Sequence, residues 1–348
     1  MTIYLVMLTF IGILACWSVF LPARMRVVRI LLAAIGYSSV CLFIGLRDQV
    51  GPDWDTYEMM FKMIEHLPLW ASMIIAEPLY VVSNRVAALV GGDIHLVNLF
   101  CALVLTVSLY KFSRLLEIDP NLLLFISAPY LLFVVGMGYT RQSAAVGLCL
   151  VAAGYLRRNR PRMFYLFACA AVLFHYSALF LLLLWWVNSV KRMAIVALGL
   201  LAASPLIYLM LSSDERYAQY VQSNSQLQSH GVWSRILLVL LGLAIIYTQR
   251  VQWNREGKLR DLIIRCGVAL VFLMVLSVFL STLADRLCLY LFFIYIAASG
   301  KIIRYAKPPF RYLTLFSLFS GTYAVFVVWF ALSPLASIGW IPYHNVLF

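Results

Sequence analysis

Charged residues are scarce in this sequence. Only 12% of its 348 residues are charged and 64% are apolar, whereas soluble globular proteins average about 25% charged and about 45–50% apolar residues. This balance excludes a soluble globular domain, because such a chain could not keep its apolar surface away from water. The apolar residues form long runs rather than the alternating segments of about ten residues that a membrane β-barrel needs. We therefore predict an all-α, polytopic integral membrane protein.

Several motifs that carry chemistry in other proteins are also missing. There is no phosphate-binding P-loop, no glycine-rich dinucleotide loop and no serine nucleophile elbow. The seven cysteines lie inside apolar runs without the spacing of metal ligands, so we interpret them as small buried hydrophobic residues. The sequence thus contains no local motif that predicts a cofactor or a metal ion.

The apolar runs define the expected helices. We expect about 11–13 transmembrane or re-entrant helices in a single integral membrane domain over residues 1–348. The first run is expected to be a retained helix rather than a cleaved signal peptide, because no basic segment precedes it. The runs cover residues 3–20, 27–45, 95–110, 121–137, 140–156, 163–175, 177–190, 193–211, 233–249, 262–283, 286–300 and 312–332.

The basic residues predict which ends of these helices face the cytoplasm. If the connectors near residues 24–29, 111–114, 157–162, 191–192, 250–260 and 301–311 are cytoplasmic, they hold 19 of the 27 lysines and arginines. The net charge of +13 is then a signal of membrane orientation, and we expect no nucleic-acid partner. The opposite side, which includes the loops 45–94 and 212–232, is then the outer side of the membrane.

Two short segments do not fit a full crossing. The basic connectors near residues 24–29 and 111–114 are both predicted to be cytoplasmic, and each is separated from residues 46–94 by one crossing. Residues 46–94 must therefore begin and end outside, so the apolar run 78–90 is predicted to re-enter the membrane or to lie on its surface. Its 13 residues would rise about 20 Å, less than the hydrocarbon core of about 30 Å. The runs 163–175 and 177–190 are predicted to be two helices with a break at residues 174–177, which favours a cavity there.

The loop after the second run is the first candidate site. It places Arg47, Asp53 and Tyr57 around the turn-forming pair Gly51–Pro52 at a predicted outer helix end. An arginine here contradicts the charge rule, which favours a functional or ion-paired side chain. Asp53 and Tyr57 are four residues apart and would share a helix face, although Asp53 is equally suited to cap the helix that follows.

Further polar residues interrupt apolar runs on the same predicted side. Arg141 and Gln142 begin a helix, where a guanidinium fork and the helix dipole suit phosphate oxygens. Glu77 precedes the short run, and His175 lies in the predicted break with a side chain suited to proton transfer. Asp285 and Arg286 form either a local ion pair or a second phosphate site. Glutamines and tyrosines in the loop 212–232 suit sugar hydroxyls, or are an ordinary solvated loop.

The order and spacing of these motifs resemble those of one family, the EpsG-like group of Wzy-type polysaccharide polymerases. The resemblance spans nearly the whole chain, with Pro52 and Trp54 standing where the family often has Thr and Tyr. The segments that carry it are Arg47 with Val50–Asp53 and Tyr57, then Glu77–Tyr80, Tyr139–Gln142, Phe174–Ala178, Asp285–Tyr290 and Pro342–Tyr343.

The resemblance implies a glycosyltransferase of GT-C-like architecture in a bacterial inner membrane that joins oligosaccharide repeat units carried on polyprenyl pyrophosphate, at the periplasmic face and without a metal. We expect polyprenyl pyrophosphate-linked glycans and the lipid bilayer as partners, with a chain-length regulator as a further candidate. The expected pyrophosphate-binding residues are Arg47, Arg141 and Arg286. The candidate general bases are His175, Glu77 and Asp53, and the expected substrate contacts are Tyr57, Gln142, Tyr176 and Asp285.

Two other classes of function stay open at this point. A transporter or flippase of lipid-linked sugars would share the phosphate-binding arginines, but it should have polar sites open to both sides of the membrane. A different transferase on the same lipids, such as an O-antigen ligase or a membrane acyltransferase, would share the outer-side location. A ligase usually has a larger outer loop than 212–232, and an acyltransferase would pair its intramembrane histidine with a second catalytic residue.

Overall fold

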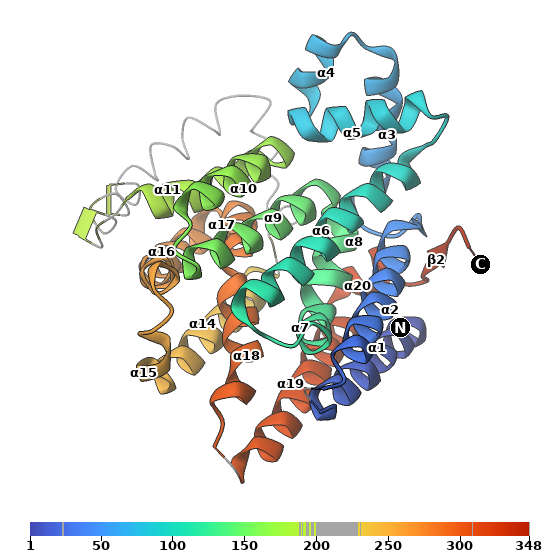
Figure 1. The fold of residues 1–348 in the computed structure, drawn as a ribbon. Helices are drawn as coiled ribbons and strands as arrows, with labels where there is room; N and C mark the ends of the chain where they lie inside the picture. Colours follow the sequence, from blue (N-terminus) through green and yellow to red (C-terminus); the bar gives the residue numbers. More distant parts are fainter. Residues whose placement is uncertain are drawn as a thin grey trace. The chain divides into compact units, whose positions relative to one another are not determined.

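The computed structural model is almost entirely helical (Figure 1). It describes the chain except residues 23, 188, 190, 193–194, 196–197, 200–228, 230, 308 and 348. The predicted run 193–211 and the predicted outer loop 212–232 therefore lie largely outside the described residues. Two compact units are present, one formed by Met1–Tyr176 with Ser299–Phe348 and the other by Ser177–Ala298, and each is described by itself.

Among the residues that the structure describes, seven helical segments are long and apolar enough to cross a membrane, which confirms an all-α, multi-pass membrane protein. In the described part of the chain, all the other predicted runs also coincide with helices. These include α9 (Thr140–Arg157), α10 (Pro161–Phe174), α11 (Leu179–Trp186) and α14 (Val232–Thr248). The seven segments are α1 (Thr2–Phe20), α2 (Arg26–Gly45), α6 (Ile94–Leu116), the segment Pro120–Gly138, α16 (Lys258–Phe279), the segment Ser281–Tyr305 and α19 (Phe310–Leu332).

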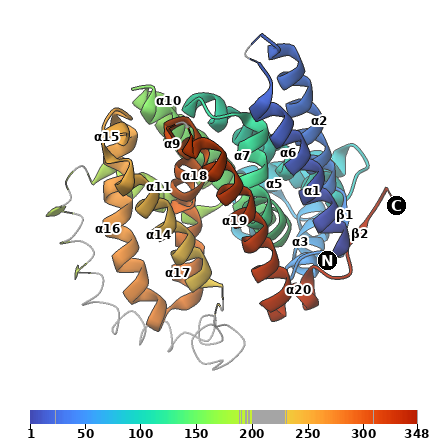
Figure 2. The ribbon, with the colours of Figure 1, turned by 90° about the horizontal axis from the view of Figure 1, so that it is seen from below.

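A fully buried segment lies at the centre of the first unit. It runs through α7 (Pro120–Ser127), the π-helix η1 (Ala128–Val135) and α8 (Gly136–Gly138), and it is apolar on every side. Such a helix must be surrounded by other helices, and α1, α2, α6, α9 and α19 pack around it (Figure 2). Pro129 lacks a backbone N–H for the α-helical ladder, which fits the wider π-helical turn around it.

Three short helices follow the second span at one end of this unit. They are α3 (Trp54–His66), α4 (Leu69–Ile75) and α5 (Pro78–Leu89). The 12 residues of α5 rise about 18 Å, too little to cross a hydrocarbon core of about 30 Å. The predicted short helix is therefore present, and its re-entry into the membrane stays a prediction.

A two-stranded antiparallel sheet lies at the same end of the first unit as α3, α4 and α5. Strand β1 (Arg47–Asp48) pairs with β2 (His344–Asn345), which follows α20 (Pro334–Gly339) near the end of the sequence. Gly51 adopts a φ of +110°, and a Cβ atom there would lie 2.5 Å from the carbonyl oxygen of Met137. Only glycine tolerates both conditions, so the Gly51–Pro52 turn brings the loop directly against the central segment.

The second unit is built from α11, α14, α15 (Arg250–Trp253), α16, α17 (Ser281–Cys288), the short turn η3 (Leu289–Leu291) and the first part of α18 (Phe293–Tyr305). Between α10 and α11 the chain passes through the 3₁₀ turn η2 (Tyr176–Ala178). The predicted helix break at residues 174–177 is thus confirmed. The cavity that this break favoured stays a prediction.

Candidate functional site

An ion pair between Glu77 and Arg141 joins separate motifs of the first unit. Nη1 of Arg141, at the start of α9, donates to Oε2 of Glu77 at 2.7 Å. The other oxygen of Glu77 accepts a hydrogen bond from the backbone N–H of Tyr176 at 3.3 Å. Glu77 precedes α5 but makes no side-chain cap to its own helix. Its carboxylate instead connects three helices that are far apart in sequence.

Two tyrosines enclose the guanidinium of Arg141. The carbon Cζ of Arg141 lies 5.7 Å from the ring centre of Tyr57 on α3 and 5.5 Å from that of Tyr80 on α5. Arg141 also forms a hydrogen bond with the Tyr57 hydroxyl, and burial raises the pKa of Tyr57 to about 12. Tyr57 is therefore a neutral hydrogen-bonding group at neutral pH. Aromatic faces and a carboxylate together hold the guanidinium in one orientation.

Part of the Arg141 side chain remains available for an anion. Its side chain is 20% exposed, whereas that of Glu77 is 7% exposed. Because an arginine has five N–H donors, it can keep its contact with Glu77 and still donate to phosphate oxygens.

His175 and Asp53 lie at the edges of this group. His175 ends α10 in extended conformation and is partly buried, and the next residue, Tyr176, contacts Glu77 through its backbone. The Tyr176 ring is 55% exposed. Asp53 directly precedes α3 without capping it through its side chain, and Tyr57 is one helical turn further along. Gln142 follows Arg141 but is buried in the interior at 2% exposure.

Arg47 has a different environment from the one that the sequence predicted. Its side chain is 1% exposed, and burial lowers its pKa to about 10, so it stays charged at neutral pH. The guanidinium donates to the carbonyl oxygens of Ile44 at 2.8 Å and Val50 at 3.0 Å. It also donates to Thr140 Oγ1 at 2.7 Å and, more weakly, to Asn98 Oδ1 at 3.4 Å. These four bonds tie the end of α2 to α6 and α9, and the pyrophosphate contact of Arg47 stays a prediction.

Asp285 and Arg286 belong to the second unit. Asp285 is buried in α17 and forms an ion pair with Arg235 of α14, which also donates to the Asp285 carbonyl oxygen at 3.3 Å. Arg286 is exposed. In the same unit the hydroxyls of Ser177 and Tyr290 lie 2.9 Å apart. The charge partner of Asp285 is thus a residue 50 positions earlier.

The sequence pattern missed three polar contributors. Tyr80 is three residues after Glu77 and could have been placed on the same helix face. Arg235 is a cation at the start of an apolar run, the same signal that identified Arg141. His95 makes contacts of 3.1 Å with Asp48 and 3.0 Å with Asp93, and it stacks obliquely on Trp54. No local motif predicts that bridge, because Asp48 is distant in sequence.

Comparison with known proteins gives one match. The model of the EpsG family matches residues 30–345, which includes every motif described above. No curated protein and no solved structure matches the chain.

Proposed function

The chain belongs to the EpsG family, which supports a general role as a membrane polysaccharide polymerase, and we propose that it joins lipid-linked oligosaccharide repeat units. The donor would be a glycan on polyprenyl pyrophosphate, and the acceptor a sugar hydroxyl of another lipid-linked unit. The C1–O bond to the pyrophosphate breaks, a glycosidic bond forms, and the hydroxyl proton passes to a base. The observation that carries this proposal is the Glu77–Arg141 ion pair, which brings together four family motifs.

Arg141 is the proposed contact to the departing pyrophosphate. Negative charge grows on the bridging oxygen as the C1–O bond breaks, and an oriented guanidinium stabilises that charge most. Glu77 accepts hydrogen bonds at both carboxylate oxygens, so we assign it the positioning of Arg141. The candidates for the base are then His175 and Asp53. Tyr176 is exposed and presents aromatic surface for the glycan, whereas Tyr57 is buried against Arg141, and its proposed contact with substrate is through that arginine.

Arg286, Asp285 and Gln142 are the other residues that the sequence predicted to contact the substrate. Arg286 is exposed and suits a second phosphate contact, whereas Asp285 is already paired with Arg235. Gln142 is buried, so its proposed role is to support Arg141 from inside α9. The architecture implied by the family resemblance, and a chain-length regulator as a partner, remain parts of the proposal.

Polymerisation can be tested with purified protein and lipid-linked repeat units as the only substrate. We expect a ladder of glycans that differ by one repeat unit, together with release of polyprenyl pyrophosphate. Parallel reactions should contain lipid A–core as an alternative acceptor, or liposomes with the substrate on one side only. Transfer to lipid A–core alone would indicate a ligase, and substrate movement without new bonds would indicate a flippase.

The periplasmic location of the site is part of the same proposal. Within the first unit the Glu77–Arg141 pair lies at one end of α6, beyond its start at Ile94, and the arginine-rich connectors lie at the other end. The 23 residues of α6 separate these ends by about 34 Å, enough to span the hydrocarbon core. The cation distribution then predicts that the site faces the periplasm.

Cysteine labelling tests this orientation. In a Cys169→Ser background, which removes the exposed native cysteine, Leu89→Cys should react with a membrane-impermeant maleimide added to spheroplasts. Leu89 is suitable because it ends α5 and is 85% exposed. Asn254→Cys, in the exposed connector between α15 and α16, is the matched control and should react only after the membrane is opened. The reverse pattern would place the site in the cytoplasm.

A further inference from the structure

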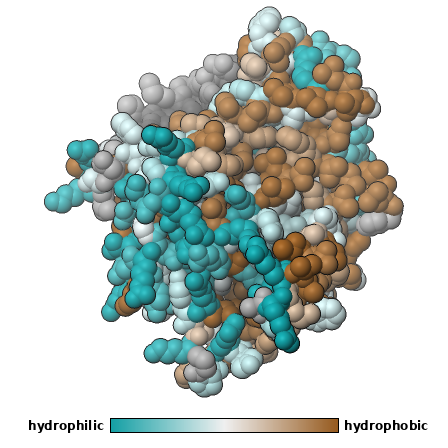
Figure 3. Space-filling view, in the orientation of Figure 1, coloured by the Kyte–Doolittle hydropathy of each residue, from teal (hydrophilic) through white to brown (hydrophobic). Residues whose placement is uncertain are grey.

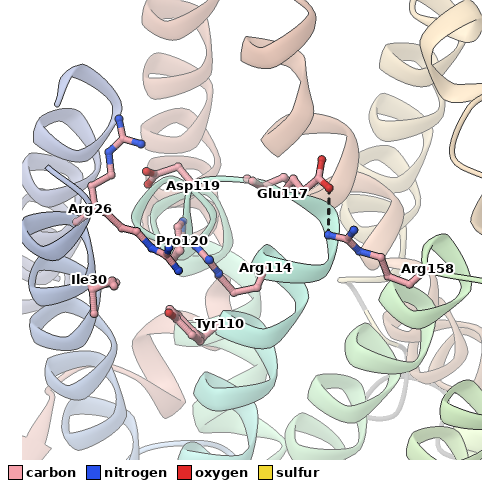
Figure 4. A pocket seen from close by; sticks show the side chains of 11 residues that line it. Arg26, Ile30, Tyr110, Arg114, Glu117, Asp119, Pro120 and Arg158 are labelled. Atoms are coloured by element: carbon pink, nitrogen blue, oxygen red, sulfur yellow. Dashed lines mark ion pairs between the residues drawn. The ribbon is translucent and has the colours of Figure 1, made fainter. Parts of the chain in front are cut away.

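A basic pocket lies in the first unit, away from the Glu77–Arg141 pair. It has a volume of about 470 Å³ and is formed where α2 begins, α6 ends and α7 begins (Figure 4). Four arginines line it, namely Arg26, Arg29, Arg114 and Arg158, against the two carboxylates of Glu117 and Asp119. In Figure 3 hydrophilic residues gather where α6 ends and α7 begins, beside the hydrophobic surface over α2 and α5.

Both carboxylates are already occupied by protein donors. Glu117 accepts from Arg157 at 3.0 Å and from Arg304 at 2.7 Å, and it pairs with Arg158 at 3.1 Å. Hydrogen bonds from Arg157 and Arg304 lower the pKa of Glu117 to about 2. Asp119 caps α7 through Leu122 and accepts from the Ser18 hydroxyl at 2.6 Å. Each carboxylate oxygen of these two acids therefore already contacts at least one donor from elsewhere in the protein.

The remaining cations have no acidic partner in the part of the chain that the structure describes. Arg26 and Arg114 make no ion pair there and are exposed, one on each side of the pocket (Figure 4). Arg29 donates to the carbonyl oxygen of Leu21, and its Nε is buried without a hydrogen bond. The three arginines that line this pocket give it the charge and the donors that bind phosphate oxygens.

An apolar groove continues from this pocket between α2 and α6. Its volume is about 610 Å³, and it shares Ile30, Ala33 and Tyr110 with the basic pocket. From there it follows the two helices to Leu42 and Leu99. Ile30 and Leu42 are 12 residues apart, which corresponds to about 18 Å along the helix axis. A molecule that fills both spaces needs an anionic head and a long hydrocarbon tail.

We propose that this combined pocket and groove binds one anionic phospholipid of the surrounding bilayer. The phosphate lies among Arg26, Arg29 and Arg114, and an acyl chain lies in the groove along α2 and α6. Charge complementarity selects the occupant, because basic pockets between membrane helices favour anionic lipid headgroups over zwitterionic ones. Because the pocket and the groove share Ile30, Ala33 and Tyr110, the head and the tail of one molecule can fill both. This proposal does not rest on the proposed polymerase activity.

The test uses delipidated full-length protein and native mass spectrometry with added phosphatidylglycerol. We expect one saturable site, and we expect the double variant Arg26→Gln, Arg114→Gln to weaken it about thirtyfold, since each surface cation contributes a factor of about five. The matched control is Arg255→Gln, Arg260→Gln, which removes two exposed cations of the α15–α16 region. Equal losses in both variants would overturn the proposal, because they would indicate general charge attraction.

The groove is tested separately from the headgroup pocket. Ser38→Phe fills the groove from its exposed rim and should weaken phosphatidylglycerol binding severalfold, whereas Ile35→Phe, at an exposed position outside the groove, should not. If the double arginine variant does not fold, these two single variants still test whether the lipid binds in the groove. Glycerol 3-phosphate should bind far more weakly than the lipid. Equal binding of glycerol 3-phosphate, a preference for undecaprenyl phosphate, or equal binding of phosphatidylcholine would each overturn the assignment.

Discussion

Replacing Arg141 by alanine should reduce the rate of glycan polymerisation by about 100-fold or more. This is the usual loss when one oriented donor to a developing negative charge is removed. Arg141→Lys should restore little activity, because a lysine ammonium cannot bind Glu77 and a phosphate in the bidentate geometry of a guanidinium. The measurement is the polymer length distribution and the initial rate of polyprenyl pyrophosphate release, at matched protein abundance.

The control for Arg141 is another arginine from the same end of the first unit. Arg85 on α5 donates to the Glu65 carbonyl oxygen and to the Ser72 hydroxyl, and it is not part of the Glu77–Arg141 group. Arg85→Gln should therefore keep polymer length. Glu77→Gln should give an intermediate loss, since the amide can still accept a hydrogen bond but provides no charge. Polymer of normal length from the Arg141→Ala protein would remove Arg141 from the site.

Replacing Arg47 by methionine should destabilise the folded protein by about 4 kcal/mol or more. The guanidinium satisfies buried acceptors on Ile44, Val50, Thr140 and Asn98. A buried acceptor that loses its donor costs about 1–3 kcal/mol. The expected result is low abundance of folded protein and a lower midpoint of thermal unfolding in detergent.

The Arg47 variant also separates a structural role from a catalytic one. The sequence predicted that Arg47 binds pyrophosphate, whereas its burial and its bonds indicate that it holds the ends of α2, α6 and α9 together. A stable Arg47→Met protein without polymerase activity would restore the predicted role. Arg24→Met, which changes an exposed arginine at the other end of the helices, controls for the loss of a cation.

Helix positions were predictable because they depend on local composition. The seven spans begin and end within a few residues of the apolar runs, and the break at residues 174–177 was visible from its polar residues. The sequence predicted that Arg141 lies on the opposite side of the membrane from the basic connectors, and in the first unit the two groups lie at opposite ends of α6. Arg157, Arg158 and Arg304 gather at Glu117, and Arg141 lies near the other end of α6 with Glu77.

Side-chain partners were less predictable, because they depend on which helices pack together. The apolar pattern identified Arg47 and Arg141 by the same signal, namely a cation at an outer helix end. Only the tertiary structure distinguishes them, since Arg47 is surrounded by carbonyl and hydroxyl acceptors and Arg141 by one carboxylate and two rings. Likewise, Asp285 was expected beside Arg286, but the packing of α14 on α17 provides Arg235.

The pairing of β1 with β2 has a consequence for the biosynthesis of the protein. Residues 340–346 contact the end of the first unit that carries β1 at several points, through Trp340 to Phe133, Tyr343 to Phe43 and Val346 to Leu46. These residues leave the ribosome after the seven candidate spans of the described chain, so the loop that carries Arg47 and Asp53 reaches its final form only after those spans have been synthesised. A chain truncated before residue 340 would lack these contacts.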